Sequence, residues 1–203
     1  NTFDKAVNDN QNYRAGVDFF INDKHTTGIL FRGNHSTNDD KTTSTTEVMN
    51  NNVLDSTYNT ENKSNGKYTN LTFNINHVFR IDTAGRELTA DIDFAQYENS
   101  TNFNFRTNHF SINPPNLPYT ILEKSLQPAT ITIKSGKADY THPLSKTMKF
   151  ETGIKSSYVE TDNDVKYYRI NNETEILDSG KTNHFIYKEN INAAYINWSA
   201  QFG

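Results

Sequence analysis

Long stretches of this chain alternate between apolar and polar residues, the pattern of a β-strand whose two faces meet different surroundings. The clearest run spans Thr69 to Ile81. Its apolar series is Leu71, Phe73, Ile75, Phe79 and Ile81, with His77 in the same register and mainly Asn, Thr and Arg between. On a helix this series would scatter around the cylinder instead of forming a face. The run therefore predicts a strand.

Similar runs predict seven strands, and the abundance of Asn, Thr, Tyr and Phe over strong helix formers agrees with an all-β chain. The predicted strands cover residues 11–21, 26–36, 67–81, 86–99, 129–141, 148–161 and 184–200. We therefore expect residues 1–203 to form one region, an antiparallel up-and-down meander.

Strand length and connection length together point to a membrane. Most predicted strands hold 11–15 residues, whereas soluble strands cluster near 5–6 and membrane-spanning strands need about 9–11. Short connections at 22–25, 82–85 and 142–146 alternate with long polar ones at 33–66, 99–128 and 162–183. Outer-membrane barrels have short periplasmic turns and long outer loops. The sequence thus predicts part of a transmembrane β-barrel in the cell outer membrane, in contact with its lipid.

The number of predicted strands indicates an incomplete barrel. Bacterial single-chain barrels have an even strand count, and seven is odd. The chain begins Asn1-Thr2-Phe3 and ends directly after an alternating stretch. We expect a piece of a larger barrel, or a chain lacking its leader, folded as a curved meander with two unpaired edges.

Composition removes several classes of function. Hydrophobic residues are 33% of the chain and Asn alone accounts for 29 residues, yet aromatics reach 12%, which argues against a disordered polymer. There is no cysteine, which excludes disulfides, thiol catalysis and thiolate metal sites. The net charge of −4 gives no basic field for nucleic acid. No apolar run approaches the length of about 20 residues that a transmembrane helix needs.

No catalytic, metal or cofactor site is predicted. The six histidines do not show the spacing of a zinc site. Asp91 and Asp93 share a strand face, which suits acid–base catalysis or a polar lumen paired with residues such as Lys134 and Lys155. We predict the lumen, because no nucleophile–base pair accompanies the two carboxylates. The chain is accordingly expected not to be an enzyme.

The aromatic residues have two interpretations. A girdle at the lipid–water interfaces would use Tyr13, Phe31, Tyr68, Phe79, Tyr140, Phe150, Tyr158, Tyr187, Tyr195 and Trp198. A sugar-binding platform would instead stack aromatic rings on a glycan. Tyr167 and Tyr168, in a predicted outer loop, are the candidate ligand-contacting residues for that platform. We favour the girdle for the strand residues and leave both interpretations open for the loop pair.

Several segments resemble a known family. They are Gly136–Leu144, Lys149–Val159, Thr161–Asp164, Phe185–Tyr195 and the turn and strand Asp82–Leu88. These segments are similar to the outer-membrane β-barrel family of Bacteroidota that is related to TonB-dependent receptors. The resemblance covers most of the chain from about Lys67 onward. It implies the middle of a large barrel, solute transport across the outer membrane, and a separate plug domain that contacts TonB. The cargo, a small solute or a glycan, is not specified by these residues.

A second hypothesis is a soluble all-β module, of the carbohydrate-binding or adhesin type. In that case the series Leu71, Phe73, Ile75 and Phe79 would form a core face, and two such sheets would pack on each other. The two hypotheses differ in one observable. A membrane barrel leaves an apolar band about 25 Å tall exposed, whereas a sandwich buries it.

Overall fold

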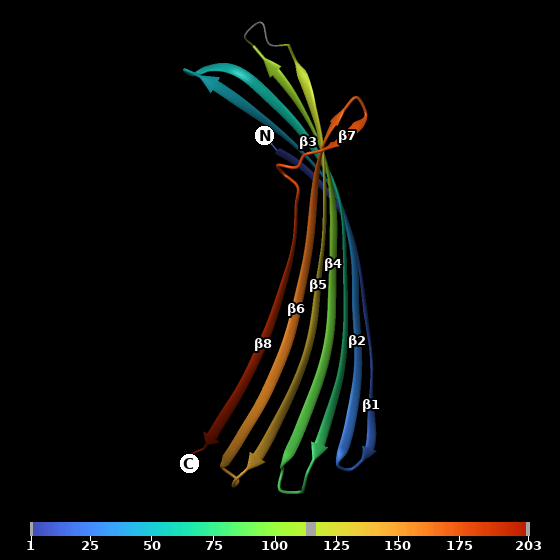
Figure 1. Ribbon diagram of the computed structural model, residues 1–203, viewed down its shortest axis with the longest axis vertical. Helices are drawn as coiled ribbons and strands as arrows, with labels where there is room; N and C mark the ends of the chain where they lie inside the picture. Colours follow the sequence, from blue (N-terminus) through green and yellow to red (C-terminus); the bar gives the residue numbers. More distant parts are fainter. Residues whose placement is uncertain (1, 113–116, 202–203) are drawn as a thin grey trace.

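The computed structural model describes residues 2–112 and 117–201, which form eight strands and no helix long and apolar enough to cross a membrane. The strands are β1 (Thr2–Asn22), β2 (His25–Asn50), β3 (Val53–Arg80), β4 (Glu87–Ser111), β5 (Tyr119–Pro143), β6 (Met148–Asn171), β7 (Thr174–Leu177) and β8 (Asn183–Ala200). Figure 1 shows them as one curved and twisted sheet, with the short turns gathered at the lower end.

Every neighbouring pair of strands is antiparallel, and the order from β1 to β6 follows the sequence. Beyond β6, the short β7 pairs with the distal end of β6 while β8 pairs with the rest of it. The predicted antiparallel meander is therefore confirmed. The described sheet is not closed, because β1 lies at one edge and β8 at the other.

The sheet is a single layer without a hydrophobic core: no described apolar side chain is buried. Large apolar residues are instead widely exposed, with Ile92 at 65%, Ile154 at 64% and Ile196 at 75%. A soluble sandwich needs a second sheet to cover such residues, and the described residues form only one. Whatever covers this face therefore lies outside the described residues.

All seven predicted strands lie within observed strands, apart from Ile81 and Arg86, which fall one residue outside β3 and β4. The predicted long polar connections are wrong as loops. They are mostly strand, because β2–β3, β4–β5 and β6–β7 continue as hairpins far beyond the predicted ends. These distal parts are mostly polar on both faces, so apart from the short alternation at Phe103 and Phe105 in β4 they carry little signal that a sequence pattern could detect. The short β7 was not predicted.

Two of the distal hairpin tips are tight two-residue turns. Asn51 and Asn52 have φ values of 48° and 62°, and Asn172 and Glu173 have values of 46° and 65°. Positive φ at both central residues is the geometry of a type I′ turn, which matches the twist of the flanking strands. Asn tolerates this conformation well, whereas Glu does so poorly.

Candidate functional site

The strand register assigns every side chain to one of two faces, because successive residues of a strand point to opposite sides. Residues that the register aligns from strand to strand form a row, and all members of one row lie on the same face. One row reads Val17, Ile29, Ile75, Ile92, Gly136, Ser156 and Asn192, and the next row, on the opposite face, reads Asp18, Gly28, Asn76, Asp91, Lys137, Lys155 and Ala193. We call the face of Ile75 the apolar face and the face of Asp91 the polar face.

The apolar face carries a belt of large aliphatic and aromatic side chains. Its members include Val17, Phe19, Ile29, Phe31, Leu71, Phe73, Ile75, Leu88, Ile92, Phe94, Ile154, Ile196 and Trp198. On β3 the apolar face runs from Leu71 to Phe79. These eight residue steps cover about 27 Å along the strand, near the 25 Å height of a lipid-facing band. This belt is the outward surface of a membrane-embedded sheet.

The polar face is joined by hydrogen bonds that run across the strands. The Asn74 amide on β3 donates to the Asp93 carboxylate on β4 at 2.7 Å, and the Ser135 hydroxyl on β5 donates to the other oxygen of Asp93 at 3.2 Å. Asn76 donates to Asn74 at 3.0 Å. Asp93 is thus held by neutral donors from both neighbouring strands.

A second polar cluster lies between β5 and β8. Lys137 makes an ion pair with Asp139 at 2.5 Å, and the Tyr195 hydroxyl donates to Asp139 at 2.7 Å. Nearby, Asn197 of β8 donates to Glu151 of β6 at 3.0 Å. Lys137 neutralises Asp139, and the hydroxyl and amide donate to carboxylate oxygens, on a face that has no other protein layer over it among the described residues.

Some, but not all, of the residues predicted to line the lumen lie on the polar face. Asp91 and Asp93 do share the polar face, and Lys155 lies on that face one strand beyond Lys137. The expected role of Lys134 is wrong, because the register puts Lys134 on the apolar face, opposite Phe94. The sequence reasoning also missed Asn74, Ser135 and Tyr195 as partners, since only the register shows which residues become neighbours.

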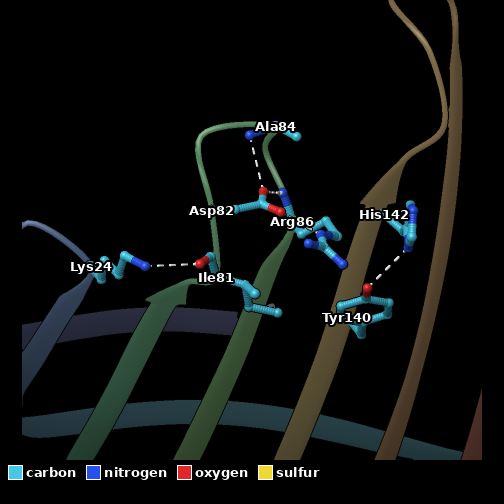
Figure 2. A network of polar contacts seen from close by, with 7 residues as sticks. All are labelled: Lys24, Ile81, Asp82, Ala84, Arg86, Tyr140 and His142. Atoms are coloured by element: carbon cyan, nitrogen blue, oxygen red, sulfur yellow. Dashed lines mark hydrogen bonds and ion pairs between the residues drawn. The ribbon is translucent and has the colours of Figure 1, made fainter.

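The short turn between β3 and β4 is fixed by one carboxylate (Figure 2). Asp82 accepts hydrogen bonds from the backbone N–H groups of Ala84 and Arg86, at 3.0 Å and 3.2 Å, and from the Arg86 side chain. The hydrogen bond from Arg86 lowers the pKa of Asp82, although desolvation opposes the shift. Asp82 in turn raises the pKa of Arg86. Lys24 donates to the Ile81 carbonyl at 3.2 Å and ties the neighbouring turn to this one.

Tyr167 and Tyr168 lie in the distal part of β6 and not in an irregular loop. As consecutive strand residues they point to opposite faces of the sheet, so they do not form one continuous platform. The Tyr167 ring lies 5.9 Å from the ammonium of Lys181, and its hydroxyl accepts a hydrogen bond from Gln127 at 3.4 Å. A ligand contact at either ring stays a prediction.

The register places some of the aromatic residues expected in the girdle on the apolar face and others on the polar face. Tyr13, Phe31, Phe79, Tyr140, Phe150, Tyr158 and Trp198 share the apolar face. Tyr68, Tyr187 and Tyr195 lie on the polar face, so they are not lipid-facing. Most of the wrongly placed residues lie in β8, because apolar residues occur on both faces of that strand and the alternation is weak.

Across residues 2–112 and 117–201, no group of three or more His, Asp or Glu side chains is arranged to hold a metal ion. What the site offers is a surface for lipid on one side and, on the other, a surface of hydroxyl, amide and charged groups.

This arrangement, a single antiparallel sheet of long strands with one apolar and one polar face, defines a segment of an outer-membrane β-barrel. Residues 79–203 match the model of the outer membrane protein beta-barrel family, which is more than half of the chain. The chain therefore belongs to this family, and the family places it in the outer membrane. The apolar face is the lipid-facing surface, and the polar face is the luminal surface.

Comparison with other proteins adds little detail. No curated protein matches the chain. Among solved structures, the chain is similar to the ferric yersiniabactin uptake receptor FyuA from Yersinia pestis, with 9% identity and a TM-score of 0.26. The similarity covers 96% of this chain and 43% of the receptor chain, so this chain spans less than half of that receptor's length.

Proposed function

We propose that the chain forms part of the wall of a solute pathway across the outer membrane. The observation that carries the proposal is the contrast between the two faces at adjacent positions. Ser135 takes part in the luminal hydrogen bonds of Asp93, while Gly136 belongs to the lipid-facing row of Ile92. A wall with paired carboxylates, amides and hydroxyls suits the passage of polar solutes, and the chain's role would be permeation and binding instead of catalysis.

The test uses two neighbouring single-cysteine variants of the full-length protein, Ser135→Cys and Gly136→Cys. Residues 1–203 hold no cysteine, and any cysteine elsewhere in the full-length protein is first replaced by Ser, so that a bulky water-soluble thiol reagent modifies one chosen position. After reconstitution into liposomes, modification of Ser135→Cys should reduce solute flux several-fold, because the adduct projects into the lumen. Modification of Gly136→Cys should leave the flux unchanged. Equal flux for both modified variants would contradict the proposal.

The more specific form of the proposal is uptake driven by TonB through a plug domain. Its support is the resemblance carried by Gly136–Leu144, Lys149–Val159 and Phe185–Tyr195. Cells that express the full-length protein should then lose uptake of its solute when TonB is deleted or the proton gradient is dissipated. Uptake that persists under both conditions would leave passive diffusion as the mechanism.

The solute itself is proposed to be small and polar, or a glycan. Tyr167 and Tyr168 are the aromatic residues of the distal region that would contact a glycan. Replacement of each by Ala, one at a time, should weaken glycan binding to intact cells for the residue whose face is luminal, Tyr167. Equal binding by wild type and both variants would remove this region from the proposal.

A further inference from the structure

Two arginines on the luminal face lie directly opposite each other. Arg14 of β1 and Arg32 of β2 are register partners, and both side chains are exposed to the lumen. Like charges at directly opposed positions of a sheet destabilise it. A lysine pair could relieve the repulsion by losing a proton, but guanidinium groups stay protonated. This pair is therefore a permanent concentration of positive charge.

Neither arginine forms an ion pair with any described residue, in contrast to Lys137, which pairs with Asp139. Arg32 shows this best, because it lies inside the sheet and its two cross-strand neighbours are Arg14 and Thr72. Arg14 lies on the edge strand β1. A carboxylate on a strand that paired with the free edge of β1 would lie next to Arg14. Arg32, one strand further in, would still have no partner.

The arginines border a luminal hollow of about 360 Å³. Its other polar walls come from Thr72, in the row of the arginines, and from Asn12, Asn34, Asn70 and Tyr97, two rows away on the same face. Asn34 donates to Asn12 at 2.7 Å, so part of the amide row is already ordered. The Asn70 amide oxygen is enclosed and has no hydrogen-bond donor among the described residues.

We propose that Arg14 and Arg32 form an oxyanion-binding subsite in the luminal wall, which takes the phosphate, sulfate or carboxylate group of a polar solute. The inference rests on the proposed function in one respect, that the polar face lines the pathway. Guanidinium groups present a planar fork of donors that matches oxyanions in two-point contacts. A bound anion would offset the repulsion between the arginines, and the amide row would meet hydroxyl groups of the same solute.

The experiment measures binding of inorganic phosphate and sulfate to the purified full-length protein in detergent by calorimetry, against chloride at equal ionic strength. The variants are Arg14→Gln and Arg32→Gln, with Arg106→Gln as the matched control. Arg106 lies on the distal part of β4, on the opposite face from the arginine pair. Loss of one charge-assisted contact should weaken oxyanion binding about tenfold or more. Arg106→Gln should bind as the wild type does.

A second readout separates binding from a structural role. In chloride, Arg32→Gln should unfold at the same temperature as the wild type or higher, because it relieves the repulsion, and phosphate should stabilise only the wild type and the control. Unchanged oxyanion binding in both luminal variants would overturn the proposal, as would an unfolding temperature lowered by Arg32→Gln without anion. Flux through Ser135→Cys is an independent measurement, so failure of the subsite leaves the pathway proposal standing.

Discussion

At the scale of single residues, Gly153 shows how the luminal surface is built. It lies on the central strand of three and is the register partner of both Asp139 on β5 and Tyr195 on β8. The Tyr195 hydroxyl reaches over β6 to donate to Asp139 at 2.7 Å. A Cβ atom at position 153 would collide with the Asp139 carboxylate and the Tyr195 ring. Glycine therefore lets the ring lie across the strand and satisfy a carboxylate two strands away.

Gly153→Ala should destabilise the sheet by about 1–3 kcal/mol, because the methyl group displaces the ring and weakens its hydrogen bond. Gly136→Ala is the matched control, since an added Cβ there meets only the Asp91 carbonyl oxygen at 4.0 Å. It should be neutral within about 0.5 kcal/mol or slightly stabilising. The measurement is the temperature at which the folded, fast-migrating gel band of the detergent-solubilised protein is lost. Equal temperatures for the two variants would refute the packing argument.

The stability that Asp82 contributes to the turn should depend on pH. Its pKa is lowered in the folded state by the hydrogen bond from Arg86. A lowered folded-state value means that the contribution to stability is complete above the ordinary aspartate pKa of about 3.9 and is lost as the pH falls through the folded value. Asp82→Asn should thus lower the unfolding temperature at pH 7, and the difference from the wild type should shrink below about pH 4.

Arg86→Gln provides the control for that prediction. Because both groups act in one ion pair, the double variant should be little less stable than either single variant. A difference between wild type and Asp82→Asn that stays constant from neutral to acidic pH would show that the carboxylate's charge is irrelevant and that only its backbone hydrogen bonds matter.

At the scale of elements, alternation predicted the strands where the two faces meet different phases, as in residues 67–81. It failed where they do not. The distal half of β3 reads Val53 to Gly66 and has polar residues on both sides, so no period-two signal separates a strand from a loop. For the luminal site, the sequence predicted a polar surface but not which residues contact each other on it. Partners such as Asn74, Ser135 and Tyr195 depend on register, which is set by pairing between strands and is absent from the pattern of any one strand.

The turn of the β6–β7 hairpin holds a residue in an unfavourable backbone conformation. Glu173 has a φ of 65°, a left-handed conformation that costs most L-residues roughly 1 kcal/mol. Glu173→Asn should stabilise this hairpin by up to about that amount, since Asn tolerates the conformation. Hydrogen exchange of the amide groups paired between β6 and β7 should slow. Glu175→Asn, at a strand position two residues away, should not slow it. Faster exchange in Glu173→Asn would contradict the turn argument.

At the scale of the whole molecule, the lipid-facing belt crosses the hydrogen-bonded rows diagonally. Followed away from the short turns, its uninterrupted apolar series ends at Tyr13 on β1 and at Ala194 on β8, where Gln11 and Asn192 come next on the same face. The register aligns Ala194 with Phe19. The belt therefore drops six residues, from 13 to 19, over the six strand-to-strand steps from β1 to β8. This average of one residue per step is about 3.4 Å along the strand for about 4.8 Å across the sheet, which corresponds to a strand tilt of about 35°. Barrel strands tilt by roughly 35–45°, so the slant of the belt is the one that barrel geometry requires.

This tilt predicts different membrane depths for residues of one hydrogen-bonded row. Phe94 on β4 and Asn190 on β8 belong to the same row and the same face. A spin label at Phe94→Cys should be relaxed mainly by oxygen dissolved in the lipid, whereas a label at Asn190→Cys should be relaxed mainly by a water-soluble nickel complex. Labels at Leu71→Cys and Ala194→Cys, which lie in different rows but both at the margin of the belt, should report similar depths. If Phe94→Cys and Asn190→Cys reported equal depths, the rows would lie parallel to the membrane and the sheet could not be a tilted barrel wall.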